Sequence, residues 1–434
     1  MNGYLEMKKS EAKWIGDIPS HWQVVRMKNI FQNVSEKNHP EAEVLSLYRE
    51  LGVLPKNSRD DNHNVTSEDT SSYKFVRKND LVINKMKAWQ GSLAISNYEG
   101  IVSPAYYVCH FKDEKVSTRY YHYLLRAKSY AQEFERLSTG MRIGQWDLGI
   151  DDFMSVPALV PPIDEQVGIA KFLDEKCPEI DKLIEEAQSS IGEYKQWKAA
   201  IIFELTTKGM NPSVEMHNSG NRWIGEIPSH WRVAKTLHCL SMAITDGPHA
   251  TPELFDDGIP FISAEAVSCG NGRIDFSHMR GYISEEFYNE CCKKYVPEVD
   301  DVYMIKSGAT TGRVSIVDTE RIFTIWSPLA VFRANRKRIM PKYLFYALQS
   351  DYYQKQVELG WTYGTQQNIG MRTLETLKIC LPPLDEQKMI VEYLDKKCGY
   401  IDDLIAEKEA VVDDLNLYKR SIIHEAVTGK RKVV

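Results

Sequence analysis

Residues 161–177 read PPIDEQVGIAKFLDEKC, and residues 382–398 read PPLDEQKMIVEYLDKKC. These stretches open two blocks of 47 residues that align without gaps at an offset of 221 (382 − 161), with 20 identities. In each copy a Pro-Pro pair ends the preceding segment. Asp164 and Asp385 then suit a helix N-cap, with Glu and Gln in the first turn. The blocks therefore predict the same helix at two places in one chain.

Beyond each helix start the apolar residues recur at a spacing of three and four. Pro178 and Gly399 predict a break or kink after a short first helix, and this unlike pair can make the two helix starts unequal. The pattern that follows is typical of a coiled-coil seam. Its positions are Ile180, Ile184, Ala187, Ile191, Tyr194, Ile201 and Leu205, and Ile401, Ile405, Val412, Leu415, Ile422 and Ala426. Each helix needs a partner, and its sequence twin is the obvious one.

A second motif repeats ahead of these blocks. Residues 14–22 read WIGDIPSHW and residues 223–231 read WIGEIPSHW, so eight of nine positions are identical. The chain is therefore two tandem halves, each far longer than one unit of a solenoid. The Trp-containing blocks are expected to pack as scaffold elements. A pseudo-twofold molecule follows from the duplication.

Each half is expected to hold one globular domain and one helical spacer. The assigned ranges are 1–160 for the first domain, 161–208 for the first spacer, 209–222 for a polar linker, 223–381 for the second domain and 382–434 for the second spacer. Strand-like runs separated by Gly and Pro turns predict an α/β or α+β fold for both domains. The runs 80–83 and 301–305 predict strands, and 120–137 and 342–359 each predict one helix.

Composition restricts the class of protein. The 434 residues contain no apolar run of 18, so we expect no membrane span. They contain no apolar segment near the start, so we expect no secretion and a cytoplasmic location. Eight cysteines without a C-x-x-C pair predict reduced thiols and no zinc site, with Cys177 and Cys398 as small buried residues. The net charge of −6 is concentrated in the spacers, since residues 164–204 carry −5 and residues 385–434 carry −2.

Catalytic motifs are missing from the sequence. Residues 306–312 are rich in glycine but lack the G-K-[ST] of a phosphate-binding loop, and no H-E-x-x-H, G-x-S-x-G or G-x-G-x-x-G occurs. Asp300, Asp301 and Lys306 are better explained as a charged strand start than as a nuclease centre. We expect no catalytic residue and no metal ligand. An assembly scaffold with two domains for ligands other than DNA, or a self-contained nuclease, remain as alternatives.

The duplicated layout and motifs resemble the DNA-specificity (S) subunit of type I restriction–modification systems. The resemblance is carried by WIG[DE]IPSHW and PP[IL]DEQ, and also by NKMKAWQGSLA at 84–94, GIVSPAYYV at 100–108 and TDGPHATPE at 245–253. It implies two target recognition domains, each reading half of a bipartite site in double-stranded DNA. It also implies an antiparallel coiled coil that acts as a ruler; 27 residues, 178–204, would span about 40 Å, close to one turn of B-DNA.

The same resemblance implies the partners and the chemistry. Two methyltransferase (M) subunits would dock on the spacer helices, and restriction/motor (R) subunits would join through them. S-adenosylmethionine, ATP and Mg would be bound by those partners, so this chain would be non-catalytic and bind no cofactor. The spacer positions assigned to this role are Ile180, Ile184, Ile191, Tyr194, Ile201, Ile401, Ile405, Val412, Leu415 and Ile422.

Candidates for DNA contact are side chains that can reach base edges or phosphates from loops. They are Lys85, Lys87, Trp89, Gln90, Arg142 and Gln145 in the first half, and His249, Thr251, Lys306, Arg313, Tyr363, Thr365, Gln366 and Gln367 in the second. Gln145 and Gln366 recur at equivalent positions although the two targets should differ, so a structural or phosphate role is preferred for them. Trp89 is as compatible with packing, and His249 with capping a turn. The near-neutral domains predict that this chain alone binds DNA weakly.

Overall fold

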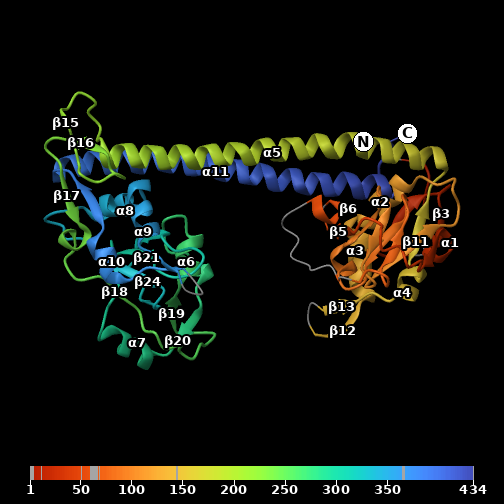
Figure 1. The fold of residues 1–434 in the computed structure, drawn as a ribbon, viewed down its shortest axis with the longest axis horizontal. Coiled ribbons are helices and arrows are strands. Elements are labelled where there is room, and N and C mark those ends of the chain that lie inside the picture. The colour runs from red at the N-terminus through yellow and green to blue at the C-terminus, as the bar shows by residue number, and fades with distance from the viewer. Residues whose placement is uncertain are drawn as a thin grey trace. The chain divides into compact units, whose positions relative to one another are not determined.

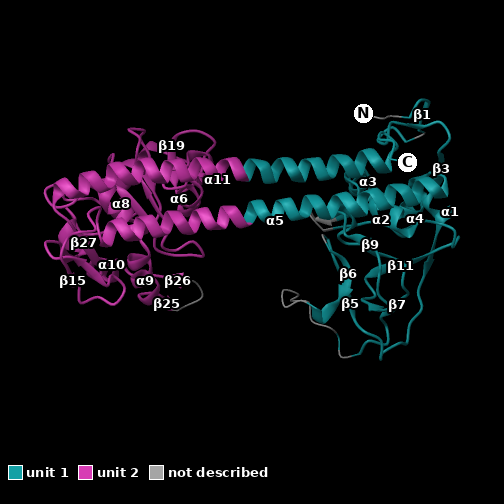
Figure 2. Ribbon diagram, turned by 90° about the horizontal axis from the view of Figure 1, so that it is seen from above, with its two compact units in different colours: residues 1–188, 409–434 teal, residues 189–408 magenta. Residues whose placement is uncertain are grey.

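The computed structural model describes residues 4–10, 12–49, 51–58, 67, 69–142, 145–363 and 367–433. It forms two compact units (Figure 2). Unit 1 contains residues 1–188 and 409–434, and unit 2 contains residues 189–408. Each unit therefore holds one globular domain together with part of each spacer helix. None of the described helices combines the length and hydropathy that a membrane span requires.

The spacers are two long helices, α5 (Ile163–Thr207) and α11 (Leu384–Val427) (Figure 1). The predicted break at Pro178 and Gly399 is wrong, because both helices run through these positions. A proline inside a helix costs about 3 kcal/mol. Cys177, Ile180 and Ile184 are buried on either side of Pro178, and burying each large apolar side chain returns about 1.5–3 kcal/mol. Packing therefore outweighs the local penalty.

The helix starts differ slightly from the sequence prediction. Because α5 begins at Ile163 and α11 at Leu384, Asp164 and Asp385 lie in the first turn rather than at the N-cap. Their carboxylates still face the positive end of the helix dipole there.

Within each unit the two long helices pack side by side in opposite directions. In unit 1, Lys419 Nζ lies 2.6 Å from Asp181 Oδ1, and in unit 2, Lys198 Nζ lies 2.7 Å from Asp402 Oδ1. The two pairs are equivalent, because 402 − 181 and 419 − 198 both equal 221. Lys198 interrupts the apolar seam in sequence, and the ion pair explains how a charged side chain is tolerated there. The coiled-coil prediction is confirmed within each unit.

The seam residues pack inward. Nine of the thirteen predicted positions are buried, namely Ile180, Ile184, Ala187, Ile191, Leu205, Ile401, Ile405, Ile422 and Ala426. Four others are half-buried, namely Tyr194, Ile201, Val412 and Leu415. Ile202 is buried more deeply than Ile201 in the first copy. The seam therefore joins the helices to each other and to their domains, and a docking partner has to use other helix positions.

Each globular domain is built on a four-stranded antiparallel sheet, which confirms the α+β assignment. The strand orders are β4-β11-β8-β9 in unit 1 and β18-β24-β21-β22 in unit 2. The strands are β4 (Phe31–Val34), β11 (Tyr106–Phe111), β8 (Leu81–Asn84) and β9 (Leu93–Ile95), and β18 (Thr245–Asp246), β24 (Leu329–Phe332), β21 (Val302–Ile305) and β22 (Val314–Ile316). The predicted strands at 80–83 and 301–305 thus become β8 and β21.

Shorter elements surround each sheet. Unit 1 adds β1 (Met7–Lys9), β2 (Asp17–Pro19), β3 (Gln23–Arg26), β5 (Leu45–Tyr48), β6 (Gly52–Pro55), β7 (Lys74–Val76), β10 (Gly100–Val102), β12 (Thr139–Arg142), β13 (Gln145–Asp147), β14 (Pro157–Val160), α1 (Met27–Ile30), α2 (Thr118–Arg126), α3 (Lys128–Leu137) and α4 (Ile150–Ser155). Unit 2 adds β15 (Met216–Asn218), β16 (Glu226–Pro228), β17 (Arg232–Lys235), β19 (Ile259–Ile262), β20 (Gly281–Ile283), β23 (Thr324–Ile325), β25 (Thr362–Tyr363), β26 (Gln367–Asn368), β27 (Lys378–Leu381), α6 (Ala264–Cys269), α7 (Glu285–Cys292), α8 (Pro341–Gln349), α9 (Asp351–Leu359) and α10 (Met371–Thr376).

The single helices predicted over 120–137 and 342–359 are wrong, because each is two helices. Ala127 separates α2 from α3, and Ser350 separates α8 from α9, both with extended backbone angles (ψ 143° and 141°). In unit 2 the Ser350 hydroxyl accepts a hydrogen bond from Thr206 near the end of α5, at 3.1 Å. The bend lets tyrosines on both helices of the pair, such as Tyr343 and Tyr353, reach the same core.

The two repeated motifs contact each other in space. Glu165 at the start of α5 accepts hydrogen bonds from Trp22 Nε1 (2.9 Å) and His21 Nε2 (2.6 Å). Glu386 is held by Trp231 and His230 at the same distances. Trp22 and Trp231 are both buried. The Trp-containing blocks therefore pack as scaffold, as predicted, and the Glu of the PP[IL]DEQ motif is what they bind.

The glutamine of the same motif fastens the next element. Gln166 Oε1 accepts from the Ser117 amide at the start of α2, and Gln387 Oε1 accepts from the Met340 amide at the start of α8 (3.1 and 2.8 Å). Both glutamines are buried and donate back to the carbonyl of the first proline of their motif, at 2.9 Å. Each motif thus satisfies backbone groups that burial would otherwise leave unpaired.

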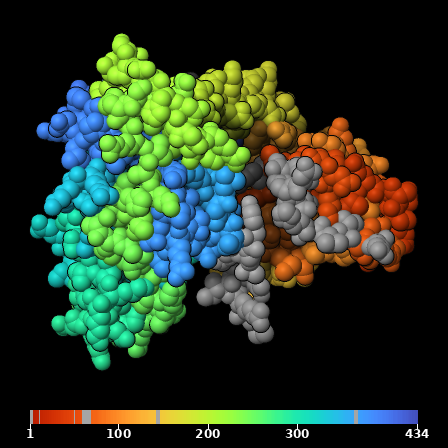
Figure 3. Space-filling model, turned by 60° about the vertical axis from the view of Figure 1, so that its left-hand side comes forward, coloured from red at the N-terminus to blue at the C-terminus, as the bar shows by residue number. Residues whose placement is uncertain are grey.

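The range 209–222 is more than a linker. It contains β15, which pairs with β16 in the register Met216↔Pro228, just as β1 pairs with β2 in unit 1. Gly209, two residues beyond the end of α5, has φ 72°, and a Cβ there would lie 3.0 Å from the ring of Trp231. The segment is therefore the second copy of the N-terminal hairpin. In unit 2, β17 pairs with β27, and Figure 3 shows green residues beside blue residues that lie much later in the chain.

Candidate nucleic-acid interface

Most of the described candidate residues lie on one loop and one hairpin in each unit, whereas His249 and Thr251 follow β18. β8 and β21 each run into a loop, at 85–92 and 306–313, and the hairpins are β12–β13 and β25–β26. The Leu148 amide donates to the Lys85 carbonyl (3.0 Å), and the Ile369 amide donates to the Lys306 carbonyl (2.9 Å). The two bonds are equivalent at the offset of 221. Segments about 60 residues apart in sequence are therefore joined in the same way in both units.

In unit 1 the loop side chains hold the hairpin. Lys85 Nζ lies 3.2 Å from Asp147 Oδ2. The Trp89 ring meets the Trp146 ring edge-on at 5.1 Å between centroids, and its Nε1 donates to the Met86 carbonyl. Trp89 is half-buried, so packing is its visible role.

The remaining loop residues of unit 1 face solvent to different degrees. Lys87 is exposed, whereas Gln90 is half-buried and accepts a hydrogen bond from the Arg49 guanidinium. Gly91 ends the short turn after Trp89 with φ 81°, a conformation that favours glycine. Of the two loop lysines, Lys87 is therefore the more accessible.

In unit 2 the equivalent lysine is already engaged. Lys306 has a side chain only 12% exposed, and its Nζ lies 3.3 Å from Oδ2 of Asp246, which is 1% exposed. Lys294 also pairs with Asp246, and His249 Nε2 lies 3.4 Å from the same carboxylate while its ring stays 75% exposed. Lys294 and Lys306 carry two positive charges against the single negative charge of Asp246, so this cluster keeps a net positive charge. Lys306 acts here as a structural cation, and His249 is the accessible group.

The other predicted residues of unit 2 lie apart from this ion cluster. Arg313 Nη1 donates to the Ser268 carbonyl at 3.0 Å. Thr251 is exposed, and Gln367 is half-buried with its carbonyl accepting from the Gly308 amide. The side chains of Arg142, Gln145 and Tyr363, and all of Thr365 and Gln366, lie outside the described residues. For these five, and for the whole set, DNA contact stays a prediction.

Sequence reasoning missed several residues that shape the site. Trp146, directly beside Gln145, packs on Trp89, and its position next to a predicted contact was an available signal. Lys294 reaches Asp246 from 48 residues away, and Arg49 reaches Gln90 from 41 residues away. No local pattern marks such pairs, because they depend on how the loops fold back.

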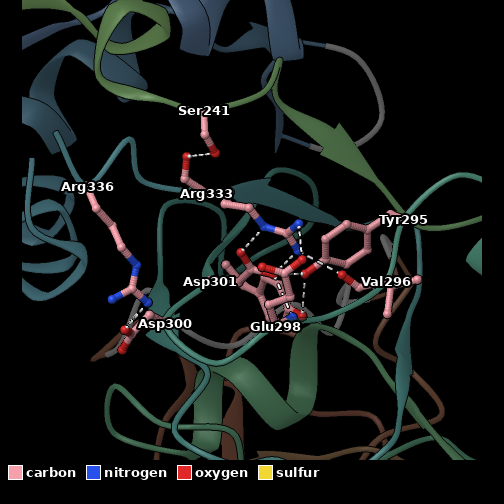
Figure 4. A network of polar contacts seen from close by, with 9 residues as sticks. Ser241, Tyr295, Val296, Glu298, Asp300, Asp301, Arg333 and Arg336 are labelled. Carbon is pink, nitrogen blue, oxygen red and sulfur yellow. Dashed lines mark hydrogen bonds and ion pairs between the residues drawn. The ribbon is translucent and has the colours of Figure 1, made fainter. Parts of the chain in front are cut away.

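The acidic pair considered for a nuclease is bound in a structural network (Figure 4). Asp301, 1% exposed, receives Arg333 Nε at 2.7 Å and Nη2 at 2.8 Å, together with the Tyr295 hydroxyl. This carboxylate raises the pKa of Arg333, and burial raises that of Tyr295. Asp300 pairs with Arg336 at 2.6 Å. In the part of the chain that the structure describes, no group of acidic, His or Cys side chains could hold a metal ion.

Unit 1 contains the equivalent carboxylate with a different partner. Asp80, at 301 − 221, accepts from the Arg77 amide and pairs with His110 Nδ1. Burial raises the pKa of Asp80, and these contacts only partly offset the effect. The buried carboxylate at this position therefore pairs with the permanently charged Arg333 in unit 2 and with the titratable His110 in unit 1.

Comparison with known proteins shows which family and which relatives this chain resembles. Residues 19–188 and 249–413 match the family model described as the type I restriction modification DNA specificity domain. The chain is 25% identical to the type I restriction enzyme MjaVIII specificity subunit of Methanocaldococcus jannaschii, over 96% of this chain and 94% of that protein. It is 26% identical to the StySPI specificity subunit of Salmonella potsdam, over 47% of this chain and 44% of that protein.

The fold is also shared with a solved structure. A chain from a structure that concerns complex assembly and conformational transition of the type I R-M system has a TM-score of 0.68, with 16% identity, over 95% of this chain and 99% of that one. The family match covers more than half of the chain, with one matched segment in each half. The chain therefore belongs to the type I restriction–modification DNA specificity family.

Proposed function

We propose that this chain is the specificity subunit of a type I restriction–modification complex, and that each unit reads one half of a bipartite site in double-stranded DNA. The observation that supports this proposal most directly is that the same backbone arrangement occurs in both units with different side chains. The Lys85–Leu148 and Lys306–Ile369 backbone bonds are equivalent, whereas Met86-Lys87 in one loop stands where Ser307-Gly308 stands in the other. Two readers of different half-sites require the same support and different base contacts.

The catalytic chemistry is assigned to partners. Asp301 is 1% exposed and its carboxylate is already bound by Arg333 and Tyr295. A self-contained nuclease is therefore not favoured, and membership of a DNA specificity family disfavours a scaffold for other ligands. S-adenosylmethionine, ATP and Mg are proposed to bind to the methyltransferase and motor subunits, with this chain binding no cofactor and acting in the cytoplasm, where its DNA lies.

Two methyltransferase subunits are proposed to dock on the outer faces of the long helices, one per unit. Trp197 in unit 2 and Tyr418 in unit 1 support this, because they are equivalent at the offset of 221 and both are exposed. Each precedes the lysine of the repeated ion pair. Large exposed aromatic side chains of this kind are typical of interface anchors. Restriction/motor subunits would join through the methyltransferase.

Methylome sequencing tests the proposal. A bipartite adenine-methylated motif should disappear when the gene is deleted and return when it is restored. Exchanging residues 23–155 for those of a relative should change one half of the motif and leave the other half intact. If no such motif is lost on deletion, the proposal fails.

A further inference from the structure

A large groove on unit 2 lies outside the candidate DNA interface. It has a volume of ≈ 780 Å³ and forms where β17, β27 and the chain after β24 meet. We call it the basic groove, because its described lining includes five cations and no acidic residue. The five are Arg232, Lys235, Lys337, Arg338 and Lys378, with His230 and His238 beside them.

Among the residues that the structure describes, no ion pair neutralises the five cations of the basic groove. The ion pairs of the described residues nearby join His230 to Glu386 and Arg336 to Asp300, and none includes any of the five groove cations. Arg338 donates to the His238 carbonyl, which leaves its charge intact. Four of the five are exposed, and Lys378 is half-buried. Like charges held this close repel one another, so an anionic partner would lower the energy of the surface.

Unit 1 offers an internal comparison for the strand positions. β3 pairs with β14 in the register Arg26↔Pro157, and β17 pairs with β27 in the register Lys235↔Lys378. At the offset of 209, Gln23 is the counterpart of Arg232. Three cations of unit 2 therefore correspond to a single arginine in unit 1.

The loop positions show the same difference. The Lys112 amide donates to the Ile30 carbonyl, and the Asn335 amide donates to the Cys239 carbonyl. This equivalence, at an offset of 223, makes Glu114 the counterpart of Lys337 and Lys115 the counterpart of Arg338. The formal side-chain charges at the five positions sum to +5 in unit 2 and to +1 in unit 1. The charge is therefore an addition to one unit and not a consequence of the shared fold.

The position of the groove separates it from the candidate DNA interface. In the β21–β24 ladder, Ile305 pairs with Leu329 at the end that leads to the loop 306–313. Val302 pairs with Phe332 at the other end, and the chain continues from there to Lys337 in the groove. Residues 382–384, which lead into α11, also line it. The groove thus lies at the far end of the sheet and beside a spacer helix.

We propose that the basic groove binds a carboxylate-rich segment of the methyltransferase subunit that docks beside unit 2. This inference rests on the proposed function, which gives the spacer helices to methyltransferase subunits. DNA phosphate is the other polyanion with matching charge, but a contact with it would be expected in both units and on the side of the reading loops. Because unit 1 lacks the charges, the two docked methyltransferase subunits are held unequally, and the one at unit 2 is more sensitive to salt.

The test compares matched charge reversals in the full chain. The groove variant is R232E/K235E/K337E. The control is Q23E/R26E, which together with the natural Glu114 gives unit 1 glutamates at the three equivalent positions. Each chain is co-expressed with its cognate methyltransferase subunit, and native mass spectrometry counts bound subunits as salt is raised. We expect the groove variant to lose one of two methyltransferase subunits, with at least tenfold weaker binding, while the unaltered chain and the control keep both.

A second measurement identifies the ligand class. Fluorescence anisotropy with a random-sequence DNA duplex measures DNA binding by each chain without partners. We expect the groove variant to stay within twofold of the unaltered chain. Weakened DNA binding with unchanged methyltransferase binding would overturn the inference and assign the groove to phosphates. Unchanged values in both assays would overturn it as well.

Two further controls keep the result interpretable. Thermal unfolding shows whether each variant is folded, and R232Q/K235Q/K337Q, which removes charge without reversing it, should give an intermediate loss of methyltransferase binding. If the unaltered chain binds no methyltransferase subunit and directs no bipartite methylation, the proposed function itself fails. A defect confined to the groove variant leaves that function in place.

Discussion

At position 165 one carboxylate receives hydrogen bonds from Tyr4, His21 and Trp22. Burial raises the pKa of Glu165, but the three hydrogen bonds outweigh burial, and the pKa lies below its ordinary value of 4.5. A group with a lowered folded-state pKa stabilises the fold above its unfolded pKa and loses that contribution as the pH falls. Unit 1 is therefore expected to lose stability in acid, below about pH 4.5.

Replacing Glu165 by Gln tests this contribution. Hydrogen bonds to a charged group are worth about 1.5–3 kcal/mol, so E165Q should lower the free energy of unfolding at pH 7 by about that amount per bond weakened, and less at pH 4. Urea unfolding at both pH values measures the difference. E175Q, at an exposed position of the same helix, is the control and should change little. An equal loss for E165Q at both pH values would contradict the assigned role.

Lys87 carries a prediction for DNA binding. It is exposed on the loop of unit 1, whereas the side chain of Lys85 is already paired with Asp147. K87A in the assembled complex should weaken DNA binding and reduce the slope of log affinity against log salt by about 1, as the loss of one phosphate contact does. Fluorescence anisotropy across a salt series measures both. K171A, on the exposed face of α5, should leave the slope unchanged, and an equal effect of the two variants would count against the loop.

At the scale of the helix, Gly399 is a local weakness inside α11. A Cβ at this position would meet nothing within 4 Å, and the backbone is helical. G399A should therefore raise the free energy of unfolding by about 0.5–1 kcal/mol. G312A is the contrasting variant, because Gly312 has φ 94° and a Cβ there would lie 2.4 Å from Gln354. Thermal unfolding should shift upward for the first and downward for the second, and a shift of both in one direction would be inconsistent with these geometries.

The elements that sequence predicted are those defined by local periodicity or by duplication. The seam of Ile180 and its successors, the strands β8 and β21, and the equivalence of Gln145 and Gln366 in the two halves were accessible in this way. The bends at Ala127 and Ser350 were not, because they follow from packing against the ends of the long helices. The same holds for Lys198, whose place in an apolar seam depends on Asp402, 204 residues away.

For the whole molecule, duplication supplies two domains on one pair of helices, and differences between the copies supply function. The scaffold contacts are retained twice, as the Glu165–Trp22 and Glu386–Trp231 bonds show. The copies differ where partners are expected, in the reading loops, in the basic groove and in the partner of the buried carboxylate. Under the proposed function, divergence of this kind lets two copies of one domain read two different half-sites.

The ruler role that the family resemblance implies for α5 and α11 leads to a prediction about these two helices. Inserting seven residues between 188 and 189 and seven between 408 and 409 keeps the seam in register, because the apolar positions repeat every 3.5 residues. It lengthens each helix by about 10 Å, so a helical ruler should select a bipartite motif with a longer spacer. Insertions of five residues shift the seam to the solvent face and should abolish methylation. Methylome sequencing distinguishes these results, and methylation of the original motif at its original spacing by the seven-residue variant would refute the ruler.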